Sequence, residues 1–225
     1  MAPHNIYIRC PARVEPGETV NCTVVYGHYF DRDGTVDPGR LKMQLAVPER
    51  DIISLDPVVA NEEIHASFKA DQPGVYVLMA EYDNGVWSVD REGRLHRGRK
   101  DDNPDVDIER VVHYVKFAKS VIVCGEINMW PGSFGMELEV VPLVLANGEA
   151  ELLVQYNGHS LNGCKVFGRA EGRPISRLAA TGEDGTVTMT LAPGRWMIVV
   201  NHERPLAEPE VTRSLQAVLV LDVAG

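Results

Sequence analysis

The sequence predicts an all-β protein built from two β-sandwich domains in tandem. Apolar and polar residues alternate in many short runs, which is the period of a strand with one buried face. Turn-forming pairs rich in Gly, Pro and Asn separate these runs, and a break rich in Gly and Pro divides them into two groups. Short strands at such regular spacing are typical of antiparallel β-sandwiches.

The first group holds six expected strands, with turns at 15–18 and 72–74. We place the strands at residues 5–10, 19–28, 41–47, 64–68, 75–82 and 108–123. The polar residues 83–107 are expected to form a loop, with room for a short strand around 86–89. Residues 108–123 also fit a helical stripe, but their many β-branched side chains favour a strand.

The second group follows a predicted linker at residues 126–135. Its expected strands span residues 136–144, 149–156, 165–168, 176–181, 186–191, 196–202 and 217–223. We therefore expect an amino-terminal sandwich at 1–125 and a carboxy-terminal sandwich at 136–225.

Composition excludes several classes of partner. The chain has 22 Lys and Arg against 32 Asp and Glu, a net charge of −10, whereas nucleic acid or an anionic membrane surface needs a positive field. No apolar run approaches the roughly 20 residues that span a bilayer, so we expect no direct membrane insertion. Met1-Ala2-Pro3-His4 lacks the basic and apolar segments of a secretory leader. A small cation suits the acidic charge better.

The usual catalytic motifs are absent from the sequence. It contains no G-x-S-x-G, H-E-x-x-H, P-loop or G-x-G-x-x-G pattern, and its four cysteines form no C-x-x-C. Asp31-Arg32-Asp33-Gly34 resembles the start of a calcium loop, but the third carboxylate and the distal Glu are missing. We therefore expect a protein that is not an enzyme.

Strand parity brings two histidines together. His4 shares the inward face of the first strand with Ile6, Ile8 and Cys10, and His28 lies on the inward face of the second strand. If the two strands form a hairpin, the register that pairs Cys10 with Cys22 also pairs His4 with His28. Directly opposed side chains lie about 4.5–5.5 Å apart at Cβ, close enough for two imidazoles to share one ion.

His113 is the third predicted ligand. In an immunoglobulin-type strand order, the last strand of the first sandwich begins at the same end as His4 and His28, and His113 lies near that start. Imidazole nitrogens suit nickel, cobalt, copper and zinc. The alternatives are that these histidines are ordinary surface residues, and that Cys10 and Cys22 form either a disulfide or two buried free thiols.

Five segments of the chain resemble one bacterial family. Residues 113–123 (HYVKFAKSVIV) and 134–143 (FGMELEVVPL) are similar to the segments on either side of that family's domain break. Residues 162–166 (NGCKV), 181–186 (TGEDGT) and 193–196 (PGRW) are similar to its closing portion. The family consists of two-domain β-proteins and is formally a domain of unknown function. Its members are commonly labelled periplasmic components of cobalt or nickel transport.

The resemblance implies immunoglobulin-like or prealbumin-like sandwiches, a periplasmic or other extracytoplasmic location and a role with metal. His4 matches a histidine in the family's first strand, and His28 matches a Gly-His before its first long loop. The expected function is thus non-enzymatic binding of a divalent transition metal, nickel or cobalt, with zinc or copper as alternatives. A membrane permease component is the expected protein partner. The alternative function is a metal-free adhesion module that binds a protein or a glycan.

Overall fold

The fold was analysed in a computed structural model, which describes residues 4–49, 51–126, 130–146, 148–206 and 210–223. Strands dominate these residues, and the helical elements among them are the two short 3-10 turns η1 (Pro38–Arg40) and η2 (Lys100–Asp102). The all-β sandwich class predicted from the sequence is confirmed. Residues 127–129 of the predicted linker, and residues 1–3, lie outside the described residues. Within the described chain, no helix is long and apolar enough to span a membrane.

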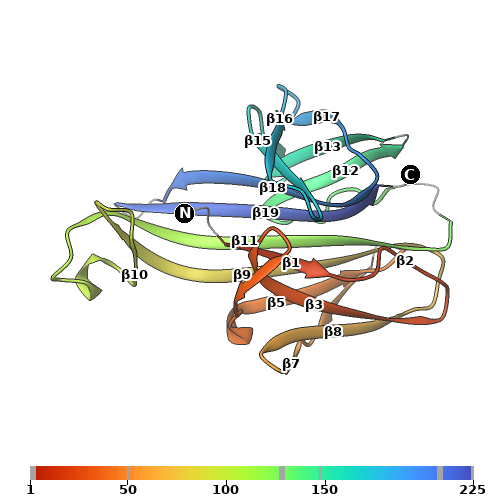
Figure 1. The fold of residues 1–225 in the computed structure, drawn as a ribbon, viewed down its shortest axis with the longest axis horizontal. Helices are drawn as coiled ribbons and strands as arrows, with labels where there is room; N and C mark the ends of the chain where they lie inside the picture. The colour runs from red at the N-terminus through yellow and green to blue at the C-terminus, as the bar shows by residue number, and fades with distance from the viewer. Residues whose placement is uncertain (1–3, 50, 127–129, 147, 207–209, 224–225) are drawn as a thin grey trace.

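The strands form three sheets (Figure 1). The five-stranded sheet contains β1 (Asn5–Arg9), β3 (Glu18–His28), β4 (Asp31–Gly34), β7 (Val58–Ala60) and β8 (Glu63–Ala70). The ten-stranded sheet contains β2 (Arg13–Val14), β5 (Leu41–Ala46), β6 (Ile52–Leu55), β9 (Gly74–Asp90), β10 (Leu95–Arg97), β11 (Ile108–Cys124), β15 (Lys165–Ala170), β16 (Ser176–Ala180), β18 (Gly194–Pro205) and β19 (Val211–Val223). The four-stranded sheet contains β12 (Leu138–Ala146), β13 (Glu149–Tyr156), β14 (His159–Ser160) and β17 (Thr186–Thr190).

The ten-stranded sheet lies between the other two, and its middle strand β11 is buried on both faces. On β11, Ala118 and Ile122 pack into a core shared with the five-stranded sheet, whereas Phe117 and Val121 pack into a core shared with the four-stranded sheet. This double burial explains why residues 108–123 have so many apolar positions, since a strand covered on both faces loses the alternation of an exposed one.

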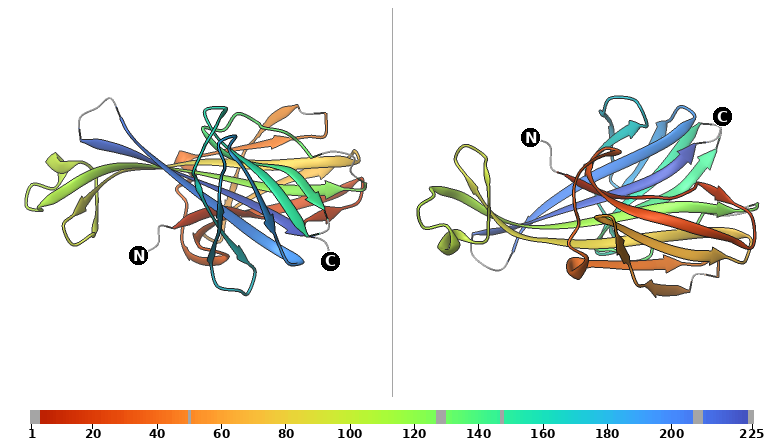
Figure 2. Two further views of the ribbon diagram at one scale, coloured as in Figure 1. Left: turned by 90° about the horizontal axis from the view of Figure 1, so that it is seen from above. Right: turned by 60° about the horizontal axis from the view of Figure 1, so that its bottom comes forward.

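A parallel strand pair joins the two halves of the chain. β19 lies beside β11 in a register that runs from Val111 opposite Val211 to Ser120 opposite Val220. We expected antiparallel pairing throughout, and this pair and the short β2–β11 pair differ from that expectation. The predicted units 1–125 and 136–225 therefore contribute strands to one twisted central sheet, which Figure 2 shows from two further sides.

Residues 83–107 are more regular than predicted. β9 continues through this segment to Asp90, pairs with β11 along its length and then pairs with β10. The turn signal Asp83-Asn84-Gly85 is accommodated as a bulge, because Val115 pairs with Asp83 and Tyr114 with Gly85, leaving Asn84 unpaired. The short strand expected around 86–89 is present within β9, and residues 98–107 lie outside strands as expected. The loop expectation was wrong for 83–85 and for β10, because a local turn sequence bends β9 here without ending it.

Candidate metal centre

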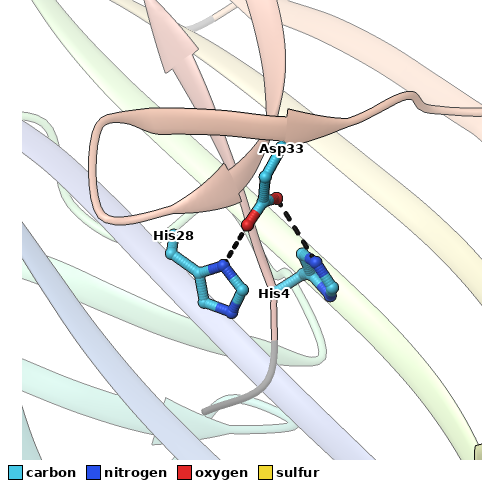
Figure 3. Close-up of side chains that lie close together, drawn as sticks. All are labelled: His4, His28 and Asp33. Carbon is cyan, nitrogen blue, oxygen red and sulfur yellow. Dashed lines mark hydrogen bonds and ion pairs between the residues drawn. The ribbon is translucent and has the colours of Figure 1, made fainter. Parts of the chain in front are cut away.

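β1 and β3 adopt the predicted register. They are antiparallel, with Asn5 opposite Gly27 and Arg9 opposite Thr23, so His4 and His28 lie side by side where the strands meet. The centroids of the two imidazole rings are 4.4 Å apart (Figure 3). At the other end of the pair, Cys10 and Cys22 are buried free thiols, and Cys10 Sγ donates to Ser120 Oγ at 3.0 Å.

A tight hairpin brings Asp33 to the two histidines. β3 and β4 are joined by the two-residue turn Tyr29-Phe30, whose φ angles of 44° and 76° are those of a type I′ turn. Gly27 is required at the start of this hairpin, because a Cβ atom there would lie 1.9 Å from the carbonyl oxygen of Asp31. A bulge follows in β4, and it leaves Asp33 between the paired residues Arg32 and Gly34.

Two side chains from other strands hold the strained turn. Positive φ in a bulky residue costs on the order of 1–3 kcal/mol, so a turn with two such residues needs support from its surroundings. The Tyr7 hydroxyl donates to Phe30 O at 2.8 Å, and Arg169 of β15 donates to Tyr29 O at 2.6 Å. Arg169 also pairs with Asp31 at 3.0 Å, so the second half of the chain anchors the hairpin that carries Asp33.

His4, His28 and Asp33 form a compact group of side chains that could hold a metal ion. Asp33 Oδ1 lies 3.3 Å from His4 Nε2, and Asp33 Oδ2 is hydrogen-bonded to His28 Nδ1 (Figure 3). One ligand atom from each residue lies within 4.8 Å of the others, and the three side chains are 27–37% exposed. Two imidazoles and one carboxylate are a common donor set for zinc, nickel, cobalt and copper, and the partial exposure leaves coordination positions open to water.

Electrostatics favour a neutral His4. Burial lowers the pKa of His4, the charges of His28 and Lys116 lower it further, and Asp33 opposes them. Lys116 is 3% exposed, and its Nζ donates to His4 O at 2.5 Å. A neutral imidazole keeps the nitrogen lone pair that a metal needs.

His113 does not join this group. Its Nε2 lies 2.8 Å from Asp83 Oδ1, and its Nδ1 lies 3.3 Å from Arg213 Nη1. Because a guanidinium can only donate, Nδ1 accepts from Arg213 and Nε2–H donates to Asp83, so both ring nitrogens have partners. Among the described residues, the one group of three or more such ligands therefore comprises His4, His28 and Asp33.

His113 is kept away from His4 and His28 because it lies on the other face of β11. The sequence correctly places His113 on the same parity as Val115 and Phe117, but that face packs against the four-stranded sheet. Lys116, on the opposite face, is the β11 side chain that reaches His4. Alternation along the strand identifies the two faces, but the second sheet that covers one of them was not foreseen.

Sequence reasoning did not single out Asp33 as a candidate ligand. The signal was present in Asp31-Arg32-Asp33-Gly34, which was compared only with a calcium loop and set aside because the third carboxylate and the distal Glu are missing. Had these residues been taken as a strand returning from a two-residue turn, alternation would have placed Asp33 on the face of His28.

The geometry and fold together define an all-β sandwich protein with a group of two histidines and one carboxylate at the end of a strand pair. Residues 1–204 match the model of a family described as Domain of unknown function (DUF4198), and the chain belongs to that family. This agrees with the unknown-function family that the sequence resembles. No curated protein matches the chain.

Two solved structures are weakly similar. One is described as "Marsupial T cell receptor", with 6% identity and a TM-score of 0.30, covering 96% of this chain and 73% of that one. The other is described as "Biofilm associated protein - BSP domain", with 8% identity and a TM-score of 0.24. It covers 97% of this chain, which spans 29% of that structure's length. Both TM-scores are too low to support an inference about function.

Proposed function

We propose that this protein binds a divalent transition metal, nickel or cobalt, through His4, His28 and Asp33. The observation that carries the proposal is the convergence of three ligand atoms within 4.8 Å at the edge of a sheet. The imidazole nitrogens and the carboxylate oxygen also suit zinc or copper. The binding is proposed as non-enzymatic.

The biological setting belongs to the same proposal. The family resemblance supports an extracytoplasmic, periplasmic location and a role accessory to metal uptake, with a membrane permease component as partner. The partly exposed site suits a protein that acquires and releases its metal. A metal ion enclosed on all sides by protein ligands can leave only after local opening of the structure, so its exchange is slow.

Calorimetric titration of the chelator-stripped, tag-free protein tests the metal proposal directly. We expect one nickel or cobalt ion per chain with micromolar or tighter affinity, and loss of at least about tenfold in affinity in both His28→Ala and Asp33→Asn. His159→Ala is the matched control, since His159 is an exposed histidine of β14 outside the group. No binding, or equal binding in all four proteins, would refute the proposal.

A second candidate function is the metal-free interaction module. It is favoured by exposed apolar side chains on two edge strands, Ile52 and Ile53 of β6 and Val58 and Val59 of β7, which are 44–62% exposed. Edge strands with apolar side chains offer unpaired backbone and contact area to a protein partner. Analytical ultracentrifugation of the wild type and of Ile53→Lys/Val59→Lys tests self-association through these two edge strands. If both proteins are monomers, the partner of this surface must be a different protein.

A further inference from the structure

A cavity of about 300 Å³ adjoins the candidate metal centre on the side of Tyr26. It lies between the amino-terminal sandwich and the base of the β9–β10 hairpin, which extends beyond the sandwiches in Figure 1. Its lining combines cations, aromatic rings and hydrogen-bonding side chains: Tyr26, Thr35, Val36, Asp37, Arg40, Tyr82, Asn84, Trp87 and Arg97. The volume is at the lower end of the range for small-molecule sites.

Two guanidinium groups supply positive charge to this cavity. Arg40 ends the 3-10 turn η1 and packs on the backbone of Gly85, where a Cβ atom would lie 2.6 Å from Nη1. Arg97 lies directly opposite Trp87 in the β9–β10 pair, so both side chains are on the same face. Within the described part of the chain, neither Arg40 nor Arg97 is within salt-bridge distance of a carboxylate.

The nearby carboxylates are already engaged. Asp37 lines the cavity, but its Oδ1 accepts from the backbone N–H of Gly39 at 3.0 Å and caps the turn that ends at Arg40. Asp83 lies outside the lining, and its Oδ1 accepts from Gly85 N and from His113 Nε2, each at 2.8 Å. The charge of the lining is therefore positive, with two guanidinium groups and one carboxylate.

Aromatic rings form the remaining walls. Tyr26 and Tyr82 meet edge to face with their centroids 6.1 Å apart. The indole Nε1 of Trp87 donates to Asn84 O at 2.9 Å, which fixes the ring. Guanidinium groups pair with carboxylates in a bidentate manner, whereas aromatic walls favour a ligand with a flat or apolar body.

We propose that this cavity binds a small organic carboxylate, held by Arg40 and Arg97 and packed against Tyr26, Tyr82 and Trp87. The inference is independent of the metal proposal, because none of the three metal-binding side chains lines the cavity. The two sites are nevertheless neighbours, since the Tyr26 ring stacks on the His4 ring with centroids 4.8 Å apart.

Titration calorimetry on the metal-free full chain tests this site with three probes. Phthalate carries two carboxylates on a flat ring, sulfate carries the charge without the ring, and benzamide carries the ring without the charge. We expect phthalate to bind with submillimolar affinity and the other two to bind at least about tenfold more weakly. Only phthalate offers both a carboxylate for the arginines and a ring for the aromatic walls. Equal binding of sulfate and phthalate would reduce the cavity to a general anion site and overturn the assignment.

Variants connect the binding to the two arginines. Arg40→Gln and Arg97→Gln should each weaken phthalate binding by at least about tenfold, since each removes one charge-assisted pair. Arg91→Gln is the control, because Arg91 is exposed and pairs with Asp107. Arg97 is exposed, so its substitution leaves the fold intact even if Arg40→Gln loosens the packing on Gly85. No phthalate binding at millimolar concentration, or unchanged binding in Arg97→Gln, would overturn the proposal.

Discussion

The imidazole of His4 has neighbours that act on its proton affinity in opposite directions. Burial, His28 and Lys116 lower the pKa of His4 from its ordinary 6.5, and Asp33 raises it. The net effect is a lowered pKa, so His4 stays neutral to a more acidic pH than a free histidine does. Burial also lowers the pKa of Lys116 to about 8, which still leaves this ammonium largely charged at pH 7. The residues around the candidate centre thus favour the neutral form of His4, which is the form that can bind a metal.

This balance predicts how metal binding depends on pH. A protonated imidazole cannot ligate, so affinity should fall as the pH drops through and below 6.5, with the His4 contribution lost on the acidic side of that value. Nickel titrations between pH 8 and pH 4.5 measure this, and we expect at least about a tenfold weaker affinity at the acidic end. The Asp33→Asn variant removes the carboxylate that raises the pKa of His4, so its acidic limb should shift to lower pH. Undiminished binding at pH 4.5 would contradict histidine ligation.

Among the elements, the β3–β4 hairpin decides the geometry of the candidate centre. It carries His28 at the end of one strand and Asp33 in the other, and its turn places Tyr29 and Phe30 in a conformation that bulky residues avoid. Tyr7 and Arg169 hold that turn from neighbouring strands. The separation of the ligands therefore depends on contacts outside the hairpin as well as on its own pairing.

Substitution of Gly27 tests this dependence. In Gly27→Ala the new methyl group meets the carbonyl oxygen of Asp31 at 1.9 Å, so the hairpin must open and Asp33 must move from the histidines. We expect metal affinity to fall at least about tenfold in calorimetry. Gly182→Ala is the matched control, because the nearest atom to its Cβ is the Asp184 carboxylate oxygen at 3.4 Å. Equal affinities in the two variants would show that the hairpin does not set the site.

At the scale of the whole molecule, a buried ion pair connects the central sheet to the four-stranded sheet. Lys119 of β11 and Glu139 of β12 are 2.7 Å apart, and their side chains are 4% and 1% exposed. Glu139 also accepts hydrogen bonds from the Ser133 hydroxyl and from the backbone N–H groups of Phe134 and Gly135. Burial alone would raise the pKa of Glu139, but Lys119 and these hydrogen bonds bring it below its ordinary value.

Breaking this pair should destabilise the protein strongly. Lys119→Met leaves a buried carboxylate without its counter-charge, and we expect the free energy of unfolding to fall by about 3–5 kcal/mol in urea titrations. The double variant Lys119→Met/Glu139→Gln removes both charges and should recover much of that loss, because the amide oxygen still accepts from the segment 133–135. If the double variant were no more stable than the single one, the loss would have to be attributed to packing.

Much of the molecule is predictable from local pattern. Alternation located the principal strands, and the register of β1 and β3 followed from matching two inward faces around the Pro16-Gly17 turn. His4 and His28 met for that reason, because a one-residue slip would have turned every inward side chain of β1 to the opposite face. The loop expected at 83–107 begins later than predicted, since Asn84 could be left unpaired in a bulge while β9 continued to Asp90.

The sequence by itself determined the all-β class, the main strands and the meeting of two histidines, because these follow from side-chain parity and turns between near neighbours. Only the tertiary structure decided that β19 pairs with β11, that the central sheet is covered on both faces and that Asp33, not His113, completes the group. Parity assigns a residue to one of two faces but carries no information on what covers that face. His113 therefore contacts Asp83 of β9 and Arg213 of β19, the strands on either side of β11, while a hairpin held by Arg169 positions Asp33.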